Sequence, residues 1–116
     1  MSKKSGAILP GWLSAYPDGK EKRFVQVGNS LLFSSSFQAL SDGAKHLYQC
    51  CAMESGGRRE FEFPLKAAKK YGLAEKSFRR HITELVNGGF IEFNSGANTR
   101  QPNKYSFSFQ WKETQN

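Results

Sequence analysis

Residues 63–90 carry the clearest pattern of apolar and polar positions in the chain. In the second half of this stretch, apolar residues recur at i, i+4, i+7 and i+8, which is typical of an amphipathic helix with one buried face. We predict this helix at about residues 75–87, closed by Gly88-Gly89. At about 3.6 residues per turn, Lys76, Arg80 and Thr83 point away from the buried face, while Arg79 lies on its flank. The buried stripe is Phe78, Ile82, Leu85 and Val86.

A shorter helix precedes this one. Pro64 suits the first position of this helix. Its fixed φ is close to the helical value, and the N–H that it lacks would have no partner within the helix at that position. Gly72 can adopt the left-handed conformation that ends a helix, and Leu73 can then fold back onto the apolar side. A helix, a short Gly-bearing turn and a second helix form a helix-turn-helix, whose second helix can enter a DNA major groove. The apolar face of the first helix is Leu65, Ala68 and Tyr71, and its polar face is Lys66, Lys69 and Lys70.

The preceding part of the chain predicts a helical lead-in at residues 29–40, followed by a longer helix that ends near residues 53–54. Ser41 is the expected N-cap of the longer helix, and Asp42 is favourable in its first turn. The apolar stripe of this helix is Ala44, Leu47, Tyr48 and Cys51.

Alternating apolar residues predict four strands, at residues 24–27, 60–63, 90–93 and 105–111. The last is the clearest, because its four aromatic residues follow a strict period of two. The last two strands form a hairpin around a turn-rich loop, whose polar tip holds Asn98, Arg100 and Lys104. The expected fold is therefore α+β, with a three-helix core and a small antiparallel sheet that includes this wing hairpin.

Composition and charge limit the number of domains and the classes of partner that we expect. The chain has 116 residues and is 38% hydrophobic, which allows one domain with a modest core. Its formal net charge is +7, which favours a polyanionic partner. Residues 58–80 hold eight Lys and Arg against three Glu, so most of the surplus lies on or beside the helix-turn-helix.

Several features point to a cytoplasmic protein. No stretch approaches the roughly 18 to 20 apolar residues of a membrane span, and residues 1–13 do not form a secretion signal. The adjacent Cys50 and Cys51 are poorly placed for a disulfide with each other. We expect a flexible basic arm at residues 1–23, one domain at residues 24–112 and a short tail at residues 113–116.

The motif residues resemble the winged helix-turn-helix domains of bacterial DNA-binding proteins. The resemblance is closest to small proteins and replication-initiator N-terminal domains of plasmids, phages and conjugative elements. It covers about residues 24–112 and implies a transcriptional regulator or a mobile-element replication protein. Ala74 departs from the pattern, because family members usually carry Ser, Thr or Asp as the N-cap of the recognition helix; a missing cap costs about 1 kcal/mol. The matching positions are Leu40-Ser41, Ala44, Leu47-Tyr48, Gly72-Leu73 and Leu85 through Gly89-Phe90-Ile91.

The resemblance also implies which residues contact double-stranded DNA. Arginine can fork onto a guanine edge or a phosphate, and lysine offers a point charge to phosphate, so binding would be salt-sensitive. A homodimer is left open, and no cofactor is expected. The groove-facing residues are Lys76, Ser77, Arg79, Arg80 and Thr83; the wing contributes Arg100 and Lys104; and Lys66, Lys69 and Lys70 grip the backbone together with Arg79.

Three alternatives compete with DNA binding. His46 and Cys50 lie at i, i+4 and could begin a metal- or thiol-responsive site, although the chain has only two His and two Cys. The aromatic row that ends the chain could instead serve a protein partner on the same scaffold. An enzyme is not expected, because no Gly-rich phosphate loop, HExxH motif or informative carboxylate pair is present. The expected core is Leu47, Phe63, Leu65, Phe78, Ile82, Leu85, Ile91, Phe107 and Phe109.

Overall fold

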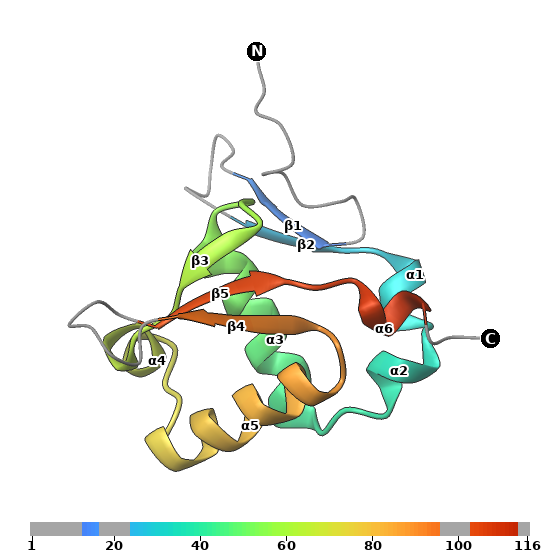
Figure 1. The fold of residues 1–116 in the computed structure, drawn as a ribbon. Coiled ribbons are helices and arrows are strands. Elements are labelled where there is room, and N and C mark those ends of the chain that lie inside the picture. The colour runs from blue at the N-terminus through green and yellow to red at the C-terminus, as the bar shows by residue number, and fades with distance from the viewer. Residues whose placement is uncertain (1–12, 17–23, 96–102, 114–116) are drawn as a thin grey trace.

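The computed structural model describes residues 13–16, 24–95 and 103–113, and Figure 1 shows how their elements are arranged. Helix α3 (Asp42–Ser55) runs through the middle of the molecule. A two-stranded sheet of β1 (Leu13–Tyr16) and β2 (Phe24–Val27) contacts α3, and so does helix α5 (Glu75–Asn87). The two-stranded sheet and α5 lie at opposite ends of the view in Figure 1. The lead-in consists of two short helices, α1 (Asn29–Leu32) and α2 (Ser35–Gln38).

A three-stranded antiparallel sheet lies over α3 in the order β3-β5-β4. The strands are β3 (Glu60–Glu62), β4 (Ile91–Ser95) and β5 (Lys104–Phe107). In the central strand, Tyr105 pairs with Phe61 on one side and with Phe93 on the other, while a register shift interrupts β4 between Phe93 and Ser95. The described part of the chain is therefore α+β, and its element order is compatible with a winged helix-turn-helix.

The cap of α3 forms as its sequence predicts. The Ser41 hydroxyl accepts a hydrogen bond from the Ala44 N–H at 3.2 Å, and Asp42 lies in the first turn. The helix continues to Ser55, one residue beyond the predicted end, because Gly56 supplies the left-handed C-cap at φ 65°. All four residues of the predicted apolar stripe are buried.

The two helices predicted on either side of the Gly72 turn are also present, as α4 (Leu65–Lys70) followed by α5. Gly72 takes φ 76°, and the Leu73 N–H donates to the Ala68 carbonyl at 2.9 Å, which closes α4 in a Schellman motif. Gly89 repeats this geometry after α5, with φ 81°. Pro64 differs slightly from the prediction, because it is the N-cap of α4 rather than its first helical residue.

Most of the predicted core is buried, and the remainder packs against it. Leu47, Phe63, Phe78, Leu85, Ile91 and Phe107 are buried, while Leu65, Ile82 and Phe109 are half-buried at its edge. Aromatic rings dominate the centre: Tyr48 meets Phe90 and Phe107 edge to face, at centroid distances of 5.3 and 5.7 Å. This packing fixes α3 against the sheet.

The prediction of one strand over residues 105–111 was wrong beyond Phe107. The chain leaves the sheet at Ser108, whose N–H donates to the Phe90 carbonyl, and then forms helix α6 (Gln110–Glu113). Trp111 lies in α6, is fully buried and stacks on Phe90 at 5.4 Å. Stacking on Phe90 stabilises the helical turn that carries Trp111, so tertiary packing overrides the alternating pattern. Glu113, assigned to a tail, is the last residue of α6.

Part of the predicted flexible arm is instead a strand. Residues 13–16 form β1, which pairs antiparallel with β2 in the register Leu13↔Val27 to Tyr16↔Phe24. Pairing with β2 satisfies backbone N–H and C=O groups of residues 13–16. The remaining arm residues, 1–12 and 17–23, lie outside the described residues. Among the residues that are described, no helix is both long enough and apolar enough to cross a membrane.

Candidate nucleic-acid interface

The outer face of α5 is exposed and cationic. Lys76, Arg80 and Thr83 are exposed, whereas Phe78 and Leu85 on the inner face are buried. Within residues 13–16, 24–95 and 103–113, neither Lys76 nor Arg80 forms an ion pair. These two charges are therefore not neutralised by the described fold. Ser77, also predicted here, is half-buried.

Arg79 lies beside this face and has a partner. Its guanidinium donates twice to one Glu75 carboxylate oxygen, at 2.9 and 3.2 Å, one helical turn away. Both side chains are more than half exposed, so the pair is weak and a phosphate can replace the carboxylate. The Thr83 hydroxyl donates to the Arg79 carbonyl at 3.1 Å, which leaves its oxygen lone pairs to accept.

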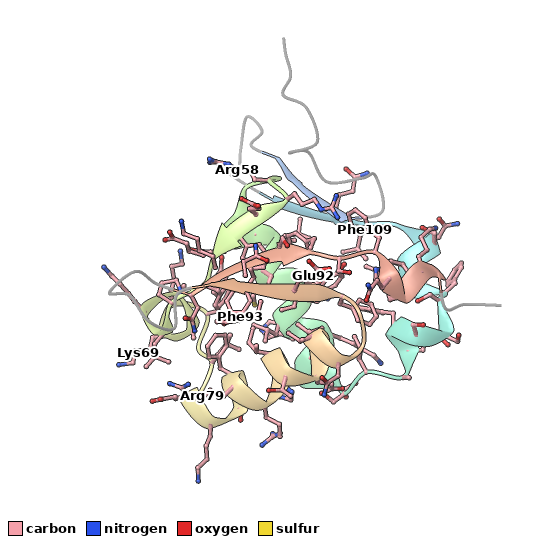
Figure 2. All side chains as sticks on the ribbon, in the orientation of Figure 1. Arg58, Lys69, Arg79, Glu92, Phe93 and Phe109 are labelled. Carbon is pink, nitrogen blue, oxygen red and sulfur yellow. The ribbon has the colours of Figure 1, made fainter. Side chains whose placement is uncertain are left out.

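The lysines of α4 differ in how far they are neutralised. Lys66 and Lys69 are exposed, and Figure 2 shows Lys69 at the end of the molecule that also carries Arg79. Lys70 instead pairs with Glu54 of α3 at 2.9 Å and lies over the Tyr71 ring. Since the Tyr71 hydroxyl also donates to Glu54, this cluster ties α4 to α3. Lys66 and Lys69 are thus the α4 lysines that are open to an anion.

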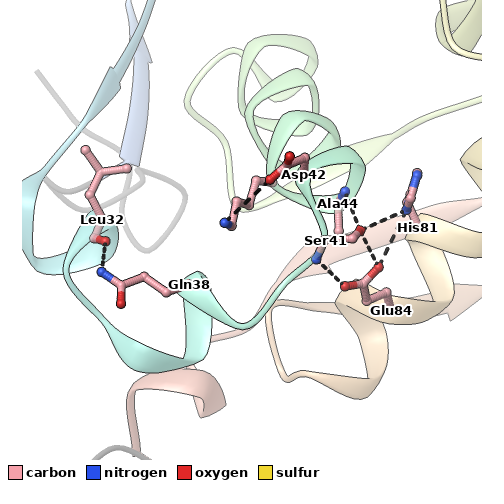
Figure 3. A network of polar contacts seen from close by, with 8 residues as sticks. Leu32, Gln38, Ser41, Asp42, Ala44, His81 and Glu84 are labelled. Carbon is pink, nitrogen blue, oxygen red and sulfur yellow. Dashed lines mark hydrogen bonds and ion pairs between the residues drawn. The ribbon is translucent and has the colours of Figure 1, made fainter.

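A polar network fixes α5 against the start of α3 (Figure 3). The Ser41 N–H donates to the Glu84 carboxylate at 2.7 Å, and the Ser41 hydroxyl donates to its other oxygen at 2.8 Å. His81 Nδ1 lies 3.5 Å from Glu84 and 3.4 Å from the Ser41 hydroxyl. Hydrogen bonding from the Ser41 backbone, helped by the Ser41 hydroxyl and by His81, lowers the pKa of Glu84.

This network resembles a capping box built from two helices. In a local capping box, an acidic residue at the third helical position reaches back to the N-cap N–H. Here Ala44 holds that position and cannot do so, and Glu84 of α5 supplies the carboxylate. Gly43 completes the fit, because a Cβ at this position would lie 2.1 Å from His81 Nε2. No local pattern indicates these contacts, because they join residues about forty positions apart in the chain.

Lys104, the predicted wing contact that the structure describes, does not join the α5 face. Lys104 is exposed on β5, opposite Glu62, and lines an open hollow of about 1020 Å³ together with Glu60 and Arg58. Tyr105, its neighbour in the strand, is buried on the other face of the sheet. The structure therefore brings Lys76, Arg79 and Arg80 together but places Lys104 apart from them. Arg100 lies outside the described residues.

A groove between α5 and the sheet was not predicted. It has a volume of about 610 Å³ and is lined mainly by apolar and aromatic side chains. Phe93 of β4 forms one wall and is 46% exposed. Phe93 lies in the predicted strand at residues 90–93, but unlike Ile91 it is not buried by the helices. Its lining includes Phe78, Arg79, Thr83, Phe93, Asn103 and Tyr105.

The residues proposed for a metal or thiol site are mostly buried. Cys50 Sγ lies 3.6 Å from His46 Nε2, and burial raises the pKa of Cys50 to about 11. Cys51 is fully buried, and burial raises its thiol pKa as well. Thiols in this state are protonated at neutral pH and are poor ligands. In the part of the chain that is described, no group of three or more His, Cys, Asp or Glu side chains is arranged to hold a metal.

The α5 N-terminus has the weak cap that its sequence implied. Ala74 takes the extended N-cap conformation, with φ −73° and ψ 142°, but has no side-chain acceptor.

Comparison with known proteins adds no assignment: no family model, curated protein or solved structure matches the chain.

Proposed function

We propose that this chain is a winged helix-turn-helix protein that binds double-stranded DNA, with α5 as its recognition helix. Lys76, Arg80 and Thr83 face the major groove, and Arg79 contacts the backbone. Lys66 and Lys69 of α4 add phosphate contacts from the adjoining helix. Six Lys and Arg against two Glu in residues 65–87 give this helix pair the charge that such contacts require.

One observation carries the proposal. Lys76 and Arg80 are exposed, one turn apart, and have no ion-pair partner in the described structure. The opposite face of the same helix is held by the core through Phe78 and Leu85. A rigid helix with uncompensated charge on its outer face suits a major groove, which is wide enough to admit it.

The two arginines and the lysine have different tasks in this proposal. Arg80 can present two parallel N–H donors to a guanine edge, which distinguishes that base from the others. Lys76 gives a point charge to phosphate, which adds affinity but little sequence information. Arg79 exchanges Glu75 for a phosphate oxygen, since the existing pair is exposed and weak. The biological role that we propose is control of transcription or replication of a mobile element.

Selection of binding sites from random-sequence duplexes, at a low and a high salt concentration, tests the proposal. We expect one motif to be enriched, and affinity to fall steeply with salt because cations are released from phosphates. A palindromic motif would indicate a homodimer, because half-sites mirror protein symmetry. If no sequence is enriched and no duplex is bound at low salt, the proposal is wrong. Binding of a protein partner by the same fold then becomes the better-supported function.

A further inference from the structure

The groove between α5 and the sheet has the chemistry of a nucleobase site. Its volume of about 610 Å³ falls within the range of small-molecule pockets, about 300 to 1,000 Å³. Its floor consists of aromatic and aliphatic side chains from α5, β4 and β5. Among the residues that the structure describes, none that lines the groove is acidic, and Arg79 is the one charged side chain in the lining. The groove therefore combines an apolar floor with a cation at its rim.

Phe93 forms the aromatic wall of this groove. Its ring meets that of Tyr105 at a centroid distance of 5.7 Å and an interplanar angle of 65°, which holds it in place. Nearly half of the residue, 46%, nevertheless remains exposed. Figure 2 shows Phe93 on β4 on the side of the sheet that faces α5, toward the end that carries Arg79. An exposed ring that is fixed by a neighbour can serve as a stacking surface for a planar base.

Polar groups gather at the Tyr105 end of the groove. Burial raises the pKa of Tyr105, while the Asn103 side chain and the charge of Arg79 both act on the same hydroxyl and oppose that rise. An amide can both donate to and accept from a base edge. Arg79 can take the phosphate of the same nucleotide, and Thr83 adds a hydroxyl to the lining.

We infer that this groove receives one unpaired nucleobase, so that the protein prefers duplex DNA with a flipped or bulged base over fully paired DNA. Phe93 stacks on the base, Asn103 hydrogen-bonds its edge and Arg79 holds its phosphate. Charge complementarity favours a nucleotide over an apolar peptide, since the one charged lining residue within the described ranges, Arg79, is cationic and lies on α5 with Lys76 and Arg80. This inference rests on the proposed function, and it specifies duplex DNA with one unpaired base as the preferred ligand.

The test compares two fluorescein-labelled duplexes that differ by one extra, unpaired thymine on one strand. By fluorescence anisotropy, we expect the wild-type protein to bind the bulged duplex at least about fivefold more tightly, the lower end of base–aromatic stacking. Phe93→Ala should abolish this preference and leave binding of the paired duplex unchanged. Phe93→Trp should retain it. Replacing the bulged base with 2-aminopurine should give fluorescence quenching with the wild-type protein and not with Phe93→Ala.

Phe33 provides a matched control, because it is 74% exposed on the C-cap of α1, in an element that is not part of the groove. Phe33→Ala should change neither affinity. Binding of both duplexes with equal affinity would overturn the inference and leave duplex binding intact. Failure to bind either duplex would overturn the proposed function as well. If Phe93→Ala instead dissociates a dimer in sedimentation and no base preference exists, the groove holds a second copy and the inference is wrong.

Discussion

Ser41 and Glu84 are joined by two hydrogen bonds that link the start of α3 to the last turns of α5. The Ser41 N–H and hydroxyl both donate to the Glu84 carboxylate, at 2.7 and 2.8 Å. One residue thus caps its own helix through Ala44 and anchors another helix through Glu84. The orientation of α5, and with it the direction in which Lys76 and Arg80 point, depends in part on this contact.

Glu84→Gln should lower the free energy of unfolding by about 1 to 2 kcal/mol, because the amide cannot accept from both Ser41 donors. Urea unfolding at neutral pH would measure this. Glu75→Gln is the matched control on the same helix, since the one ion pair that Glu75 forms with a described residue is with the exposed Arg79. Its effect should stay within about 0.5 kcal/mol. An equal decrease in the free energy of unfolding in the two variants would show that the contact between Ser41 and Glu84 contributes no more to stability than the exposed Glu75–Arg79 pair.

The same carboxylate predicts a dependence on pH. The pKa of Glu84 in the folded protein lies below the ordinary value of 4.5, so the folded state binds its proton less readily than the unfolded chain does. Its contribution to stability is therefore complete above about pH 4.5 and is lost as the pH falls through the folded pKa. The difference between wild type and Glu84→Gln should shrink on acidification. A constant difference from neutral pH to about pH 3 would contradict this.

Gly43→Ala should destabilise the protein, although alanine is normally the better helix former. The added Cβ would meet the His81 ring at 2.1 Å, and overpacking of this kind costs about 1 to 3 kcal/mol. In a His81→Ala background, the same change should instead stabilise α3 by up to about 1 kcal/mol. A double-mutant cycle by thermal or urea unfolding measures the coupling. If Gly43→Ala has the same effect in both backgrounds, the close contact does not determine its sign.

Ala74→Ser should stabilise the protein by about 0.5 to 1 kcal/mol. Ala74 already has the extended backbone of an N-cap, and a serine hydroxyl could accept from an N–H of the first turn of α5. Ala39→Ser is a suitable control, because Ala39 is an exposed C-cap residue of α2, where a hydroxyl has no such role. Unfolding midpoints of the two variants would be compared. A gain in the control but not at residue 74 would contradict the capping argument.

Trp111→Ala should be severely destabilising, by about 3 to 5 kcal/mol. The indole is fully buried and stacks on Phe90 with an interplanar angle of 9°. Phe33→Ala removes an aromatic ring that is 74% exposed, and should change stability by less than about 0.5 kcal/mol. Intrinsic fluorescence and circular dichroism would show whether the Trp111 variant retains its fold. A small loss would mean that α6 does not anchor the end of the domain.

The elements that the sequence predicted correctly are those with local signals. The capping residue Ser41 and the positive-φ glycines Gly72 and Gly89 lie within a few residues of the helices that they begin or end. The helices themselves show an apolar period near 3.6. All of these signals can be recognised in the sequence without knowledge of the fold. The direction of Lys76 and Arg80 followed from the same periodicity. This part of the candidate site was therefore predictable.

The misses depend on contacts between distant segments. Trp111 fitted an alternating pattern, but the ring of Phe90 stabilises it in a helix. Strand β1 is ordered by pairing with β2, although Asp18-Gly19 between the two runs is a hairpin signal that could have indicated it. The groove beside Phe93 depends on how β4 and β5 are placed relative to α5 in the folded protein. No local rule gives that relationship.

The most direct test of DNA binding by α5 compares Arg80→Glu with Arg58→Glu. The two variants make the same charge change on exposed arginines, and Arg58 lies at the far side of the molecule from α5 in Figure 2. Affinity for the selected duplex would be measured at about 0.15 M salt, where charges more than about 8 Å apart are largely screened. We expect Arg80→Glu to weaken binding at least about tenfold, as loss of a guanine or phosphate contact requires, and Arg58→Glu to bind like the wild type. Equal affinity of the two variants would contradict the assignment of α5 as the recognition helix.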